Sequence, residues 1–245
     1  MNCHPPMLLT AHCPLLTAHC SLPMSQRSLP NRLWYRFLQT LLQLMGVLAF
    51  RVRYVGIRNI PRVGGVLVVS NHQSALDPPL VGMASPRRMN YLARDTLFRS
   101  GPFRWLIRSL DAIPVDREGL GLGGLKESLR RLRRGEMVLI FPEGTRTEDG
   151  QIAAFLPGFT ALAVRSGAAI LPAAVEGAFA AWPRRYRFPR LGRIHVCYGR
   201  PIFGGQIEGY SQRELVAEVE RRVRQCHAQL RQHPVFAPPL RRTLA

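Results

Sequence analysis

The 245-residue sequence predicts an α/β fold in which a mostly parallel central sheet is flanked by helices and preceded by an N-terminal amphipathic helix. From residue 51 onward, short apolar runs alternate with longer segments of helical periodicity, which favours parallel strands joined by crossover helices. Gly135 and Gly167 follow two of the helical segments, at the position where glycine commonly ends a helix. The length and the 47% hydrophobic content suffice for one domain with a single sizeable core.

The elements are expected in a defined order along the chain. Residues 1–30 are rich in proline and lack a basic leader, so we expect a disordered extension rather than a secretory signal. A membrane-associating helix at 31–50, one globular domain at 51–235 and a C-terminal tail at 236–245 follow. Strands are predicted at 51–55, 65–70, 89–93, 112–115, 137–141, 169–175 and 193–198. Helices are predicted at 75–84, 95–109, 121–134, 157–166 and 211–231, and an irregular surface segment at 177–192.

The segment before the globular domain has the pattern of an amphipathic helix. Arg36, Gln39, Thr40 and Gln43 fall on one stripe, and hydrophobic side chains cover the rest. A membrane-spanning helix needs roughly 20 predominantly apolar residues. This shorter stretch with polar groups fits a helix lying in the membrane interface, or alternatively a helix packed on the domain core. Seven arginines and no acid precede Asp77, which favours the membrane surface.

The chain is strongly basic, with 34 Lys and Arg residues against 15 Asp and Glu, for a net charge of +19. Such a charge fits nucleic acid, anionic lipid or phosphorylated small molecules as partners. No helix-turn-helix, zinc-finger or aromatic RNA-binding pattern is present in the sequence, so no nucleic acid is expected, although a non-catalytic basic module stays an alternative. The five cysteines show no metal-ligand spacing, so we expect reduced thiols in a cytoplasmic setting and no metal.

A histidine and a carboxylate follow the apolar run at 66–69. Asn71 and His72 come at the predicted strand end, and Asp77 comes five residues after the histidine. A neutral imidazole, with a pKa of about 6.5, can accept a proton from a hydroxyl, and a carboxylate on its other nitrogen holds the required tautomer. We expect His72 in the strand-to-helix turn and Asp77 in the first helical turn, with Ser74 as a possible cap. The alternative is a simple turn followed by a surface acid.

A second polar block ends the apolar run at 137–141. Residues 141–146 read Phe-Pro-Glu-Gly-Thr-Arg, which predicts a tight turn with free backbone N–H groups and a guanidinium close by. Such a turn is suited to hold an anion, with Arg146 as a bidentate donor. The alternative is an ordinary β-turn with an arginine beside it.

These two blocks, in this order, resemble the NHxxxxD and FPEGTR signatures of the glycerolipid acyltransferase family, typified by bacterial 1-acylglycerol-3-phosphate acyltransferases. The resemblance covers roughly residues 50–202. Residues 112–117, ending in Arg117, resemble a further block of the family, and so do residues 170–175 around Pro172 and residues 199–202. The resemblance implies that residues 51–235 form an acyltransferase domain.

The resemblance also implies a role for each matched residue. His72 is the general base on the acceptor hydroxyl, Asp77 orients it, and Asn71 and Pro172 support the site. Phosphate binding falls to Arg117, Glu143, Gly144, Thr145 and Arg146. No cofactor is implied beyond acyl-CoA or acyl-acyl carrier protein as co-substrate.

The implied activity is acyl transfer to a lysophospholipid in phospholipid biosynthesis, with 1-acylglycerol-3-phosphate as acceptor and phosphatidate as product. Leu156 stands where the family commonly has a lysine, which keeps a different lyso-lipid acceptor open as the alternative. An anionic membrane surface is the expected further partner. The expected location is the cytoplasmic face of the cell membrane, with peripheral or monotopic attachment.

Overall fold

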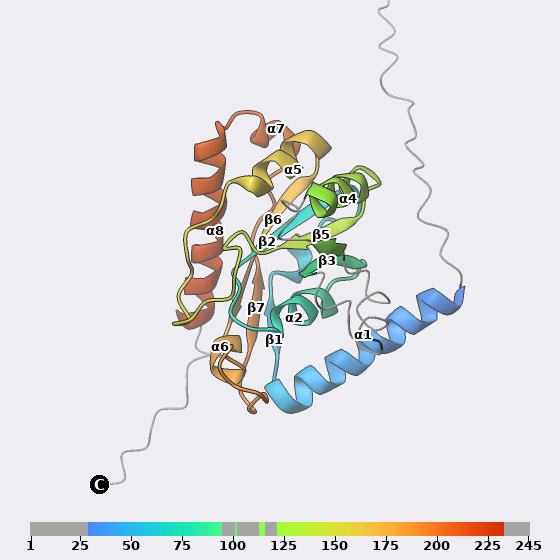
Figure 1. Ribbon diagram of the computed structural model, residues 1–245, viewed down its shortest axis with the longest axis vertical. Coiled ribbons are helices and arrows are strands. Elements are labelled where there is room, and N and C mark those ends of the chain that lie inside the picture. The colour runs from blue at the N-terminus through green and yellow to red at the C-terminus, as the bar shows by residue number, and fades with distance from the viewer. Residues whose placement is uncertain (1–28, 95–100, 102–112, 116–121, 233–245) are drawn as a thin grey trace, which may run out of the picture.

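The structure is a computed structural model that describes residues 29–94, 101, 113–115 and 122–232. At its centre lies a seven-stranded sheet in the order β1-β7-β6-β2-β5-β3-β4 (Figure 1). All neighbouring strands are parallel except β6 and β7. The strands are β1 (Arg53–Val55), β2 (Val66–Ser70), β3 (Met89–Arg94), β4 (Ile113–Val115), β5 (Met137–Ile140), β6 (Ala169–Glu176) and β7 (His195–Tyr198). The mostly parallel α/β fold predicted from the sequence is confirmed.

The helices are α1 (Leu29–Phe50), α2 (Asp77–Met83), α4 (Leu122–Arg133), α5 (Gly158–Ser166), α6 (Ala178–Ala181), α7 (Gly204–Ile207) and α8 (Gln212–Gln232), with a 3-10 turn η1 (Ile57–Asn59). All predicted strands occur, and so do the predicted helices that fall within the described residues; their ends differ from the prediction by at most two residues. The helix predicted at 95–109 lies almost entirely outside the described residues. The segment predicted to be irregular at 177–192 contains the short helix α6.

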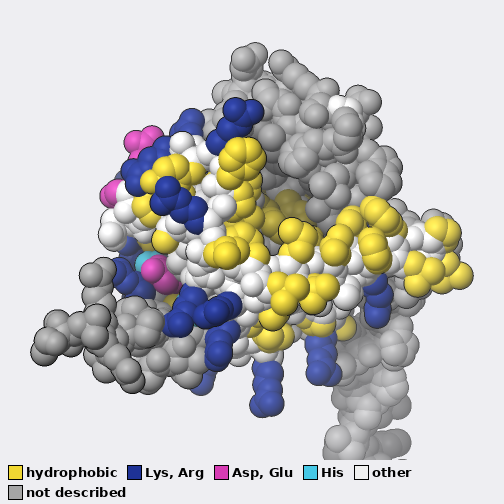
Figure 2. Space-filling model, turned by 90° about the horizontal axis from the view of Figure 1, so that it is seen from below, with side chains coloured by type: hydrophobic (Ala, Val, Ile, Leu, Met, Phe, Trp, Pro, Cys, Tyr) yellow, Lys and Arg dark blue, Asp and Glu magenta, His cyan; other side chains and the backbone are white. Residues whose placement is uncertain are grey.

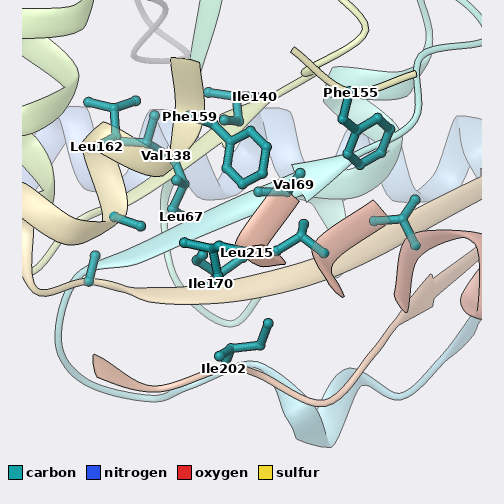
Figure 3. Close-up of a cluster of buried hydrophobic side chains, with 14 of the residues drawn as sticks. Leu67, Val69, Val138, Ile140, Phe155, Phe159, Leu162, Ile170, Ile202 and Leu215 are labelled. Carbon is teal, nitrogen blue, oxygen red and sulfur yellow. The ribbon is translucent and has the colours of Figure 1, made fainter. Parts of the chain in front are cut away.

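The sheet separates two hydrophobic clusters because successive strand side chains point to opposite faces. In β2, Leu67 and Val69 join the cluster beneath α4, α5 and α8, shown in Figure 3. Val66 and Val68 join the cluster beneath α1 and α2. All four valine and leucine side chains are fully buried. This explains why β2 reads as a continuous apolar run, as strands covered on both faces do.

Helix α1 packs one face against the domain and leaves an apolar face exposed. Gln39 and Gln43 donate side-chain hydrogen bonds to the carbonyl of Met83 at the end of α2, at 3.0 and 2.5 Å, where helix carbonyls lack intrahelical partners. Exposed hydrophobic side chains form a stripe at helical spacing along the other face: Leu33, Phe37, Leu41, Leu44 and Leu48. Across the described ranges, no helix has the length and apolar character needed to cross a membrane.

Three strand ends bring the predicted site together. Strands β2, β5 and β6 run in the same direction, so their carboxyl ends meet at one edge of the sheet. His72 follows β2, Glu143 follows β5, and residue 177 follows β6 at this edge. Ligand sites of parallel α/β sheets lie at this edge.

Candidate active site

His72 and Asp77 are held together at the edge of the sheet. The imidazole Nδ1 lies 2.9 Å from Asp77 Oδ2. Asp77 occupies the first turn of α2, as the sequence predicted, so the chain folds back from the helix to the end of β2. The Nε2 atom makes no hydrogen bond to any part of the chain that the structure describes, and the His72 side chain is 19% exposed. The imidazole can therefore meet a substrate with Nε2 while Asp77 holds Nδ1.

The Asp77 carboxylate is fully buried and organises the turn around it. Its Oδ2 accepts backbone N–H groups from Gln73 at 2.5 Å and Ser74 at 2.7 Å, besides the contact with His72. Burial raises the pKa of Asp77 above its ordinary value, and these hydrogen bonds oppose the rise. The sequence suggested Ser74 as the cap of α2, but its side chain does not cap this helix. The Ser74 hydroxyl instead donates to the Trp182 carbonyl at 2.8 Å.

Glu143 ties the two signature loops to each other. One carboxylate oxygen accepts the His72 backbone N–H at 2.8 Å, and the other accepts the Ala153 N–H at 3.0 Å. The Thr147 N–H in turn donates to the His72 carbonyl at 2.9 Å. Burial raises the pKa of Glu143, and the two backbone hydrogen bonds oppose this rise. The loop after β5 thus clamps the His72 backbone on both sides.

Two further contacts fix His72 and the strand end before it. The Phe141 ring stacks on the imidazole, with ring centroids 4.0 Å apart and planes inclined by 15°. Asn71 is buried and bonds Val175 of β6 with both ends of its amide, accepting the N–H at 2.8 Å and donating to the carbonyl at 3.0 Å. Asn71 therefore continues the sheet pairing by one side-chain step beyond β2, which positions the next residue, His72.

The predicted phosphate-binding residues fall into separate groups in space. Gly144 and Thr145 are exposed and Arg146 is half-buried in the turn between Glu143 and Thr147, next to His72. Arg117 lies outside the described residues. The Glu143 carboxylate accepts hydrogen bonds from backbone N–H groups, and its negative charge would repel a phosphate. Glu143 therefore holds the loops together and does not bind phosphate.

Pro172 lies apart from this turn. It is buried within β6, opposite Val69 of β2, three residues before His72. Its place in a central strand is notable because proline has no N–H to donate. Its carbonyl accepts the Gly199 N–H at 2.8 Å.

Several residues of the site were not singled out from the sequence. The backbone N–H groups of Gln73 and Ser74 carry no side-chain signal, so only the folded turn reveals them. The stacking role of Phe141 was also missed, although its place at a strand end beside the second block was a usable signal. Gln73 is buried as well, and its side-chain carbonyl accepts the Phe179 N–H at 3.3 Å, which joins this turn to α6.

The geometry of the site indicates a class of enzyme. A histidine held by a buried carboxylate, with its other nitrogen available, is the arrangement of a general base. The neighbouring turn is exposed at Gly144 and Thr145 and contains Arg146, and a guanidinium suits an anionic group on one substrate. A mostly parallel α/β sheet with this pair at its carboxyl edge fits an enzyme that takes a proton from a bound hydroxyl or water.

Comparison with known proteins agrees with this class. The family model described as Acyltransferase matches residues 51–176. The 1-acyl-sn-glycerol-3-phosphate acyltransferase of Bacillus subtilis is 26% identical over 192 residues, covering 78% of this chain and 94% of the relative. The enzyme of the same name from Pseudomonas aeruginosa is 33% identical over 193 residues, covering 77% of this chain and 71% of the relative.

A solved structure shares the fold. The crystal structure of the 1-acyl-sn-glycerophosphate acyltransferase from Thermotoga maritima superposes with a TM-score of 0.68 at 25% sequence identity, covering 80% of this chain and 81% of that one. The chain belongs to the Acyltransferase family, and it is an acyltransferase of phospholipid biosynthesis.

Proposed function

We propose that this chain transfers a fatty acyl group from an acyl thioester to the free hydroxyl of 1-acylglycerol-3-phosphate, which gives phosphatidate. The observation that carries the proposal is the 2.9 Å contact between His72 Nδ1 and the buried Asp77, which leaves Nε2 available beside the turn at 143–146. The names of the relatives from Bacillus subtilis and Pseudomonas aeruginosa support the same acceptor. Acyl-CoA or acyl-acyl carrier protein would be the donor.

The proposed reaction needs one base and no acyl-enzyme. His72 Nε2 takes the proton from the acceptor hydroxyl as its oxygen attacks the thioester carbonyl. The resulting imidazolium is stabilised by the Asp77 carboxylate on Nδ1. When the tetrahedral intermediate collapses, the carbon–sulfur bond breaks and the imidazolium returns the proton to the departing thiolate. Holding both substrates at one site supplies much of the remaining acceleration.

The acceptor phosphate would lie against the turn after β5. The exposed Thr145 and the guanidinium of Arg146 would supply donors there, and Arg117 would add a second guanidinium. The Gly144 N–H is already used within the turn, because it donates to the Phe141 carbonyl at 3.1 Å. In this proposal Glu143 acts as a positioning residue, because its carboxylate already holds the backbone of His72 and Ala153.

An acceptor other than lysophosphatidate is the second candidate, and one observation favours it. Leu156 is 59% exposed and lies against Gly144, where a Cβ on that glycine would be 3.2 Å from Leu156 Cδ1. An apolar side chain therefore stands beside the proposed phosphate position. A lyso-lipid with a different headgroup would suffer less from the missing cation.

We also propose that the enzyme works at the cytoplasmic face of a membrane as a peripheral or monotopic protein. The apolar stripe of α1 supports this placement, because exposed hydrophobic stripes at helical spacing commonly lie in the interface of a bilayer. An anionic surface suits the net charge of +19.

A thiol-release assay with an acceptor panel tests the proposed function. Purified protein is given acyl-CoA or acyl carrier protein donors with lysophosphatidate, lysophosphatidylcholine, lysophosphatidylethanolamine or lysophosphatidylglycerol. We expect the highest kcat/KM with lysophosphatidate, and a loss of roughly 10²–10⁴-fold in kcat for His72→Ala at an unchanged unfolding midpoint. Turnover by His72→Ala at the wild-type rate would show that another group is the base.

A further inference from the structure

The connection between β6 and β7 carries a cluster of arginines that the proposed chemistry does not use. We call residues 183–193 the arginine loop. It contains five arginines and no acid: Arg184, Arg185, Arg187, Arg190 and Arg193. All five are exposed, and so are two hydrophobic side chains, Phe188 at 72% and Leu191 at 83%. Exposed surfaces that combine charged groups with large apolar side chains are typical of sites that bind a membrane or another macromolecule.

The arginine loop lies at the same edge of the sheet as His72. Strand β6 ends at this edge, and β7 begins there because Glu176 pairs with His195 in the antiparallel ladder. The Ser74 hydroxyl donates to the carbonyl of Trp182, one residue before the loop, at 2.8 Å. The loop therefore stands beside the turn that holds the proposed general base.

The loop has a defined shape. The Trp182 indole N–H donates to the Tyr186 carbonyl at 2.9 Å, and the Arg190 N–H donates to the Ala181 carbonyl at 2.8 Å. The Arg190 guanidinium lies 4.2 Å above the centre of the Tyr186 ring. At its base, a Cβ on Gly177 would come within 2.1 Å of the Arg193 carbonyl oxygen, so only glycine permits this closure. The arginines are thus presented on a closed, internally bonded loop.

Nothing in the described parts of the chain neutralises these arginines, since none of the five makes an ion pair there. This contrasts with α8, where Arg221 and Arg224 pair with Glu218 and Glu220 at 2.8 Å each. Guanidinium groups match phosphate oxygens, while exposed phenylalanine and leucine side chains suit the boundary between headgroups and acyl chains.

The loop also adjoins the apolar stripe of α1. The Ile194 N–H donates to the Phe50 carbonyl at 3.1 Å, which joins the end of the arginine loop to the end of α1. In Figure 1, α6 and the C-terminal end of α1 lie beside each other at the lower edge of the molecule. On the face seen in Figure 2, hydrophobic side chains follow α1 and basic side chains project around them.

We propose that the arginine loop is a second membrane contact, which binds the phosphates of anionic phospholipids and inserts Phe188 and Leu191 at the headgroup boundary. Together with α1 it sets the edge that carries His72 against the bilayer, where a lyso-lipid acceptor can enter the site directly. The second statement rests on the proposed function, whereas the lipid contact itself does not.

Binding to vesicles of defined composition tests the proposal. Full-length wild-type protein is compared with the variant R184Q/R185Q/R187Q and with the matched control R58Q/R62Q/R213Q. The control removes the same charge from exposed arginines that follow β1 or begin α8, away from the His72 edge. The vesicles are phosphatidylcholine alone, or phosphatidylcholine with phosphatidylglycerol.

The loop variant should bind the phosphatidylglycerol vesicles roughly tenfold or more weakly than wild type, because each arginine at an anionic leaflet contributes about a fivefold change in partitioning. The control should change by less than about threefold, since distant charges are screened in ordinary buffer. Equal losses in both variants, or wild-type binding by the loop variant, would overturn the proposal. So would a loop variant that loses duplex DNA binding but keeps vesicle binding.

Two further measurements keep the result independent of folding and of the proposed function. Phe188→Trp in the otherwise wild-type protein should gain tryptophan fluorescence that brominated lipids quench; an unquenched signal would contradict insertion. Thiol release with a short-chain, water-soluble lysophosphatidate should stay within about twofold of wild type in the loop variant, because the general base is unchanged. If wild type itself does not turn over this acceptor, the proposed function fails while the vesicle comparison still decides the loop.

Discussion

The two oxygens of the Asp77 carboxylate have unequal surroundings. Oδ2 is hydrogen-bonded to the backbone N–H groups of Gln73 and Ser74 and to Nδ1 of His72, whereas Oδ1 has no hydrogen-bond partner in the described part of the chain. Placing three donors on one oxygen locks the direction of the carboxylate and therefore the plane of the imidazole. Burying the Oδ1 atom without a hydrogen bond costs free energy. The surrounding fold therefore holds the Asp77 carboxylate in this orientation.

Asp77→Asn separates the contribution of the charge from that of the hydrogen bonds. The amide oxygen can still accept the three donors, but a neutral group does not stabilise the imidazolium. We expect kcat to fall by roughly 10²–10⁴-fold, as for loss of general-base assistance. Wild-type turnover by this variant would show that the charge of Asp77 is not used.

The same variant has a signature in the pH dependence of stability. Burial raises the pKa of Asp77 above the ordinary value of 3.8, so the folded state binds the proton more tightly than the unfolded chain. This contribution to the free energy of unfolding is fully present below the ordinary pKa and is lost as the pH rises through the raised pKa. The stability of Asp77→Asn relative to wild type should therefore increase with pH across this window, as measured by urea denaturation. A difference that does not vary with pH would contradict the raised pKa.

Leu156→Lys tests the departure from the family at the proposed phosphate position. The lysine would place an ammonium group beside Gly144, next to the proposed position of the acceptor phosphate. We expect kcat/KM for lysophosphatidate to rise by about tenfold or more, because a charge-assisted hydrogen bond contributes about 1.5–3 kcal/mol. Leu156→Met is the matched control and should change little. A gain with lysophosphatidylcholine instead would favour the alternative acceptor.

At the scale of elements, the site is assembled by side chains that replace missing backbone pairing. Asn71 bonds both backbone groups of Val175 where the pairing of β2 with β6 ends. Glu143 similarly joins the loop after β5 to the backbone of His72. Each acts as a short cross-link between segments far apart in sequence, so the two signature blocks form one unit in space.

Helix α1 has two faces with different consequences for mutation. Replacing Leu41, Leu44 and Leu48 by serine should weaken vesicle binding while changing the free energy of unfolding by less than about 1 kcal/mol, because these side chains are exposed. Gly46→Leu should instead lower the free energy of unfolding by about 1–3 kcal/mol. Its Cβ would lie 2.7 Å from Met83 Cε and 3.3 Å from Val52 Cγ2, so the rest of the leucine side chain would overpack the contact between α1 and the domain. Urea denaturation and vesicle sedimentation distinguish the two. Loss of stability in the serine variant would show that the stripe is covered by protein.

At the scale of the whole molecule, charge and apolar surface contribute differently to membrane attachment. The net charge of +19 acts through a field that salt screens, with a Debye length of about 10 Å at 0.1 M and about 3 Å at 1 M ionic strength. At 1 M salt we expect wild type to retain part of its vesicle binding through α1, and the triple serine variant to lose nearly all of it. Complete release of wild type at 1 M salt would mean that α1 contributes little.

Much of the fold and part of the site follow from local patterns. The apolar run at 66–69 and the glycines that follow α4 and α5 are properties of neighbouring residues, so the seven strands and the longer described helices could be placed from the sequence within two residues at each end. The short helices α6 and α7 were not predicted. The spacing of His72 and Asp77 across a strand-to-helix turn is also local, and the structure brings the two together as expected.

The tertiary structure alone decided the rest, because long-range pairing leaves little trace in a local pattern. The antiparallel direction of β7 places the arginine loop at the edge with His72, although the loop lies more than a hundred residues further along the chain. The same packing turns Gln39 and Gln43 of α1 towards the end of α2 and directs Glu143 to backbone N–H groups. A side chain's type and spacing predict which chemistry it can perform, but its partner depends on which distant segments pack beside it.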